Sequence, residues 1–188
     1  MMLRAAFVPP TEAVERLRAL GGRLAQVPGI RPVEPGRVDV PIAGLGNLVE
    51  HDANRFAGLL AECLSDLEPI VVRPVAVELH GEDVTVQLDG DLAALSEVAR
   101  AVGIAAQGVR ILVDRRAFRP AVVVATRAVP DAWATRTDVL GELAGTSWLV
   151  EDVDLVRTRW FAGEARAETA YRIPFGLDGF GGRDFRTG

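Results

Sequence analysis

The stretch FRPAVVVATR, residues 118–127, contains one of the longest uninterrupted apolar runs of the chain, residues 121–125, and predicts a buried strand. A second strand is predicted over residues 37–45, where Val38, Val40 and Ile42 alternate with other residues. Pro41 removes one backbone donor from that strand, so we expect an edge position or a bulge there. The remaining elements extend outward from these two strands.

Apolar periodicity and turn residues place the other elements around the two strands. We expect further strands over residues 3–8, 71–79, 84–88, 148–160 and 167–175. We expect helices starting at Thr11, at Asp52, at Asp91 (ending near Gly103) and at Pro130-Asp131 (ending at Gly145). The order β-α-β-α-β-β-α-β-α-β-β divides into two similar halves, each with a hairpin. The prediction is an α+β fold with antiparallel sheets, in which two lobes face each other across a cleft.

Composition narrows the class of protein. The 188 residues are 49% hydrophobic and 25% charged, which is the balance of a soluble globular domain. We expect one domain over residues 1–176 and a mobile, glycine-rich tail over residues 177–188. No apolar run approaches the ~20 residues of a membrane span, and residues 1–10 do not resemble a secretion signal, so a cytoplasmic protein without membrane contact is expected.

Titratable and metal-binding side chains are scarce. The single cysteine, Cys63, lies in the apolar stripe of the second helix and is predicted to be in the core. Of the two histidines, His51 precedes that helix and His80 lies in the turn of the first hairpin. So few thiols and imidazoles predict neither a metal nor another cofactor.

Charge is unevenly distributed along the chain. All basic residues are arginines and the net charge is −5, which disfavours indiscriminate nucleic-acid binding. Residues 1–99 carry a net charge of −7 and residues 100–188 a net charge of +2. Four arginines cluster in the second part, and they form either a solvated loop or an edge that faces an anion: Arg110, Arg115, Arg116 and Arg119.

Several short motifs, in order, resemble those of the two-histidine phosphoesterases, the 2′-5′ RNA ligase-like (LigT-like) proteins. The opening LRAAFVPP, residues 3–10, matches that family's strand, proline and helix start. VDVPIAGLG, residues 38–46, stands where the family has a His-x-Thr/Ser strand and a Leu-Gly turn, and residues 118–127 stand where it has Phe-x-Pro-His-x-Thr-x-Ala-Arg. The strands over residues 148–155 and 171–174 match the family's last long strand and its tyrosine-containing strand.

This resemblance implies a bilobal fold with one motif strand from each lobe lining a central cleft. In such enzymes two histidines flank a phosphodiester as base and acid, and two hydroxyls hold the phosphate oxygens. Here the histidine positions are Asp39 and Ala121, and the hydroxyl positions are Pro41 and Val123. Of these four side chains only Asp39 can exchange a proton, so the resemblance predicts the family's fold without its catalysis.

Three functions follow from this pattern. The leading hypothesis is a catalytically inactive relative, a pseudoenzyme that keeps its cleft for binding or protein interaction, with a nucleotide or RNA phosphate as a candidate ligand. The alternatives are an active phosphoesterase that uses altered residues on 2′,3′-cyclic phosphates of RNA or nucleotides, and a protein that binds a protein partner or forms a homodimer through a filled cleft. The polar side chains proposed to line the cleft are Asp39, Arg119, Thr126, Arg127, Arg157 and Tyr171.

Overall fold

The computed structural model describes residues 1–113, 117–127, 139–161 and 164–176. Its helices are α1 (Thr11–Leu24), α2 (Glu50–Leu64) and α3 (Leu92–Gly108), with the short 3₁₀ segments η1 (Pro35–Arg37) and η2 (Gly141–Leu143). Its strands are β1 (Met2–Phe7), β2 (Ile30–Pro32), β3 (Val40–Asn47), β4 (Ile70–His80), β5 (Asp83–Gly90), β6 (Ala121–Arg127), β7 (Trp148–Val150), β8 (Asp152–Phe161) and β9 (Glu164–Pro174).

The strands form two antiparallel sheets, as the sequence predicted. The first sheet has the order β3-β1-β8-β9 and the second has the order β2-β6-β5-β4-β7. The sheets do not follow the two similar halves of the chain, because the first sheet joins β1 and β3 to the C-terminal strands β8 and β9. The two predicted motif strands, β3 and β6, belong to different sheets and pack against each other.

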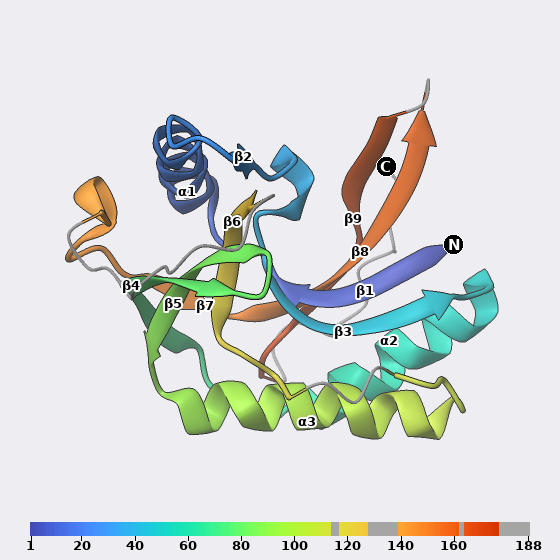
Figure 1. Ribbon diagram of the computed structural model, residues 1–188. Helices are drawn as coiled ribbons and strands as arrows, with labels where there is room; N and C mark the ends of the chain where they lie inside the picture. The colour runs from blue at the N-terminus through green and yellow to red at the C-terminus, as the bar shows by residue number, and fades with distance from the viewer. Residues whose placement is uncertain (114–116, 128–138, 162–163, 177–188) are drawn as a thin grey trace.

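The helices cover the sheets (Figure 1). Helix α1 packs on β2 and β6 of the second sheet, whereas α2 contacts β9 of the first sheet and lies beside α3. Gly21 of α1 lies directly on β6, since a Cβ atom at this position would come within 2.4 Å of the Val124 carbonyl oxygen. The absence of a side chain at Gly21 thus lets α1 approach β6 and fix its position.

The buried face of α2 differs from the predicted one. The helix buries Ala53, Phe56, Ala57, Leu60, Ala61 and Leu64. Cys63 is exposed, so its predicted burial is wrong. The prediction was based on the larger apolar residues of the helix. Three of the buried residues are alanines, whose small side chains let the helix pack closely, and the face that they form does not include Cys63.

Two helix boundaries differ from expectation. Helix α2 begins at Glu50 and Asp52 does not cap it, while α3 runs on past Gly103 to Gly108. The predicted cap of α3 is confirmed, because Asp91 Oδ1 accepts a hydrogen bond of 2.9 Å from the Ala94 amide.

The predicted fourth helix falls largely on residues 128–138, and the predicted tail covers residues 177–188; both lie outside the described residues. Among the described residues, no helix has both the length and the apolar character needed to span a bilayer.

A half-buried carboxylate and a buried one, Asp152 and Asp154, lie close together at the start of β8. Asp154 is fully buried, and Arg172 Nε of β9 lies 3.2 Å from its Oδ1 and 3.4 Å from Oδ2 of Asp152. Burial, with the neighbouring Asp154 carboxylate, raises the pKa of Asp152 to about 6, against 3.8 for a free side chain. Burial also raises the pKa of Asp154, so Arg172 does not fully compensate the two carboxylates.

Replacing Asp152 by Asn should therefore stabilise the protein above neutral pH. Because the folded pKa of Asp152 exceeds 3.8, its proton stabilises the fold at low pH, and this contribution is lost as pH rises through about 6. We expect Asp152→Asn to raise the free energy of unfolding by about 1–3 kcal/mol at pH 7.5 and to change it little at pH 4. Urea unfolding at both pH values measures this, and an equal effect at both would contradict it.

Candidate ligand-binding cleft

Two adjoining cavities lie between the sheets, and we call them together the cleft. Both are lined by Arg4 of β1, Pro41 of β3 and Val123 of β6. The first cavity, of about 430 Å³, is also lined by Glu34, Gly36, Arg37, Asp39, Thr158 and Ala167. The second, of about 520 Å³, is also lined by Ile42, Ala43, Gly44, His80, Asp83, Thr85, Gln87, Ala117, Phe118, Arg119 and Ala121. The four positions singled out by the motif strands, 39, 41, 121 and 123, thus meet in one cleft.

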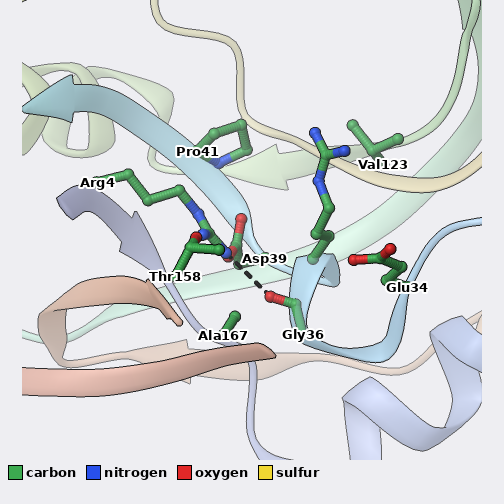
Figure 2. Close-up of a pocket in the computed structure, with 9 residues that line it drawn as sticks. Arg4, Glu34, Gly36, Asp39, Pro41, Val123, Thr158 and Ala167 are labelled. Atoms are coloured by element: carbon green, nitrogen blue, oxygen red, sulfur yellow. Dashed lines mark hydrogen bonds and ion pairs between the residues drawn. The ribbon is translucent and has the colours of Figure 1, made fainter. Parts of the chain in front are cut away.

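An ion pair between Arg4 and Asp39 dominates the first cavity (Figure 2). Arg4 donates to the Asp39 carboxylate and, over 3.0 Å, to the Gly36 carbonyl oxygen of η1. The side chains of Asp39 and Arg4 are only 7% and 23% exposed. Burial raises the pKa of Asp39 more than the guanidinium groups of Arg4 and Arg37 lower it. The charge of Arg4 is therefore already matched by a carboxylate within the protein.

The second cavity has apolar walls and a polar floor. Its walls come from residues 41–44 of β3, the segment 117–118 and the side chains of Ala121 and Val123. Phe118 is held in place by an edge-to-face contact with Phe7, with ring centroids 6.0 Å apart. The polar residues come from β4, β5 and the segment before β6: His80, Asp83, Thr85, Gln87 and Arg119.

Arg119 and His80 form a contact at the mouth of the second cavity. Arg119 Nη1 lies 2.7 Å from His80 Nδ1, and both residues are exposed. A guanidinium group can only donate hydrogen bonds, so Nδ1 of His80 accepts and the ring proton is on Nε2. Arg119 keeps its positive charge and further N–H donors, because its partner here is a neutral ring rather than a carboxylate.

Two of the six side chains proposed from the sequence line the cleft, namely Asp39 and Arg119. Thr126 pairs with Asp83, which lines the second cavity, but lies at the end of β6 beyond the lining residues. Arg127 pairs with Ile30, a core residue of β2, and lines neither cavity.

Arg157 and Tyr171 lie on the other face of the first sheet, so their proposed place in the cleft is wrong. They pair directly with Leu3 and Leu155, and directly paired residues point to the same face. Both leucines are core residues. Tyr171 accordingly packs on the core and donates a 2.7 Å hydrogen bond to Asn54 of α2, and Arg157 pairs with Glu168.

Several polar residues that line the cleft were not proposed from the sequence, among them Arg4, His80, Thr85 and Gln87. The signal for two of them is present, because Asp83, Thr85 and Gln87 alternate with buried apolar residues along β5. Arg4 and His80 gave no local signal, since their partners Asp39 and Arg119 are 35 and 39 residues away. Within the described ranges, no group of three His, Cys, Asp or Glu side chains is placed to hold a metal ion.

Removing Arg4 should leave Asp39 as an uncompensated buried charge. We expect Arg4→Leu to lower the free energy of unfolding by about 2–4 kcal/mol at pH 7.5. The cost should shrink as pH falls, because loss of Arg4 removes the strongest influence that lowers the pKa of Asp39 and lets the carboxyl take up a proton.

Chemical unfolding of a double-mutant cycle measures this coupling. The loss of unfolding free energy in the double variant Arg4→Leu/Asp39→Asn should be at least about 1 kcal/mol smaller than the sum of the losses in the two single variants. Additive effects, or a cost of Arg4→Leu that does not change between pH 4.5 and 7.5, would contradict the coupling.

Comparison with solved structures finds the same fold in several proteins, one of which is described as a phosphoesterase. TT0787 of Thermus thermophilus superposes with a TM-score of 0.72 at 19% identity, covering 93% of this chain and 98% of that one. E. coli LigT in apo form gives a TM-score of 0.73 at 16% identity, with coverage of 94% and 98%. E. coli LigT has also been solved with NADP⁺, 3′-AMP, phosphate and ATP. No protein-family model matches the sequence, and no curated protein matches it. The chain has the two-sheet fold of LigT.

Proposed function

We propose that the protein binds a nucleotide or an RNA phosphate in the cleft and does not carry out two-histidine phosphoesterase chemistry. One observation carries the proposal: residues 39, 41, 121 and 123 line a single cleft, and none of them has an imidazole. The resemblance in the sequence assigns two acid–base histidines and two phosphate-holding hydroxyls to these positions.

The side chains present cannot replace what that chemistry requires. An in-line displacement at phosphorus needs a base and an acid on opposite sides, each worth typically ~10²–10⁴-fold in rate. Asp39 is tied to Arg4 by an ion pair, and Ala121 offers no proton on the facing strand. His80 is the one imidazole among the described lining residues, and its Nδ1 already accepts a hydrogen bond from Arg119.

The second cavity supports binding of an anionic ligand. Arg119 stands exposed at its mouth with its charge unmatched by a carboxylate in that contact, whereas Arg4 is neutralised by Asp39. The apolar walls offer a surface for a base or a sugar ring next to this cation. E. coli LigT, which shares the fold, has been solved with nucleotides and with phosphate.

Binding of AMP should depend on Arg119 and on salt. We expect Arg119→Gln to weaken binding about tenfold, because it removes the cation that faces the phosphate. Raising the salt from 50 to 500 mM should weaken binding by the wild type and have less effect on the variant. Isothermal titration calorimetry measures both, with Arg100→Gln on the exposed side of α3 as a matched control that binds like the wild type. AMP binding that is unchanged by Arg119→Gln and by salt would contradict the assignment of the phosphate to Arg119.

The purified protein should not hydrolyse 2′,3′-cyclic nucleotides above background and should not join RNA ends through 2′-5′ bonds. The single change Ala121→His should leave it inactive, because the opposite acid or base and both hydroxyls are still missing. The fourfold change Asp39→His/Pro41→Thr/Ala121→His/Val123→Thr is expected to give at most a trace of turnover. Robust turnover by the wild type that is abolished by Asp39→Ala would overturn the proposal in favour of an enzyme with altered catalytic residues.

A further inference from the structure

The cleft side of β5 carries polar groups directly beside the positions where β6 has none. In the register of the second sheet, Thr85 pairs with Val123 and Gln87 pairs with Ala121. Paired residues point to the same face, and all four side chains line the second cavity. The polar groups of this part of the cleft therefore come from β5 and not from β6.

We propose that Gln87, positioned by Thr85, selects the ligand of the cleft by pairing its amide with the hydrogen-bonding edge of an adenine-type base. The inference rests on the proposed function, since it names the part of a nucleotide that enters the second cavity. Gln87 is the specificity residue in this assignment and Thr85 is a positioning residue.

Hydrogen bonds fix the orientation of the Gln87 amide. Thr85 Oγ1 donates to the Glu78 carbonyl oxygen of β4 over 3.2 Å, and its only proton is used in that bond. The oxygen of Thr85 can then only accept, and Gln87 Nε2 donates to it over 2.9 Å. A flipped amide would bring two acceptors together, so the nitrogen of Gln87 faces Thr85.

This orientation leaves Gln87 with one N–H donor and a carbonyl acceptor for a ligand. A primary amide has two donors and one acceptor, and the bond to Thr85 uses one donor. A neighbouring donor and acceptor on one planar group match adenine, which presents its 6-amino group beside a ring nitrogen. Apolar side chains flank Gln87 in the second cavity, and a hydrogen bond made beside apolar surface discriminates between rings that do and do not match.

The position of Arg119 suits the same ligand. Arg119 precedes Ala121, the partner of Gln87, by two residues, and it lines the same cavity. The cavity, of about 520 Å³, falls within the ~300–1,000 Å³ typical of small-ligand sites. A nucleoside monophosphate can place its base against Gln87 and its phosphate toward the guanidinium of Arg119.

The test compares AMP with purine riboside 5′-monophosphate, which lacks only the 6-amino group. The two probes have the same phosphate and the same ring system, so a difference between them reports on the base edge alone. We expect the wild type to bind AMP about tenfold more tightly or better, in line with the discrimination of a good paired contact. Gln87→Leu should bind both probes equally, and Thr85→Val should reduce the difference, because it frees the amide to rotate.

The matched control is Gln107→Leu, the same change at an exposed position of α3, which should discriminate like the wild type. Equal binding of the two probes by the wild type overturns the role of Gln87 and leaves phosphate binding at Arg119 standing. If Gln87→Leu still prefers AMP, another residue selects the base, and this result also overturns the proposed role of Gln87. If neither probe binds to folded wild-type protein, both proposals fail. Should Gln87→Leu not fold, undiminished discrimination by Thr85→Val overturns the inference.

Discussion

The pairing of β1 on both of its edges is the constraint on which the rest of the structure depends. β1 lies between β3 and β8, so residues near the N-terminus hold together segments from the first and the last thirds of the chain. Its register turns Leu3, Ala5 and Phe7 into the core and leaves Arg4 facing the cleft. A shift of this register by one residue would bury the guanidinium of Arg4 in the core and turn the apolar side chains of β1 toward the cleft. The strand pairing of β1 therefore also determines which of its residues line the cleft.

The cleft divides into two ends with different chemistry. At one end the charges of Arg4 and Asp39 cancel within the protein, and the pair is largely buried. At the other end Arg119 is exposed beside His80, and the residues that line the cavity with Gln87 are largely apolar, with Asp83 among them. At the first end an anionic ligand would have to compete with the Asp39 carboxylate for Arg4, and Glu34 lines that end beside Arg37. At the second end Arg119 contacts the ring of His80 rather than a carboxylate. This asymmetry is why both proposals place the ligand in the second cavity.

Local patterns predicted most elements of the fold but only part of the site. The alternation around Val40, the apolar run of β6 and the cap at Asp91 depend on near neighbours, and each gave the correct element. Which face a strand residue takes depends on the partner strand, so Arg157 and Tyr171, chosen for their chemistry, proved to lie away from the cleft. The exposure of Cys63 has a similar origin, because packing of α2 through its alanines is a property of the surface that it meets.

The interleaving of the two sheets also bears on how the chain reaches its native state. Strands β4 and β5 form a local hairpin that can pair soon after synthesis, whereas β1 and β3 await β8 and β9, more than 100 residues later. Until those last strands are made, one edge of β1 has no partner and the apolar side of α2 lacks part of its cover. Such a topology has many contacts between distant residues, which slows folding. It also makes the nascent chain, with its open strand edge, the species most exposed to aggregation.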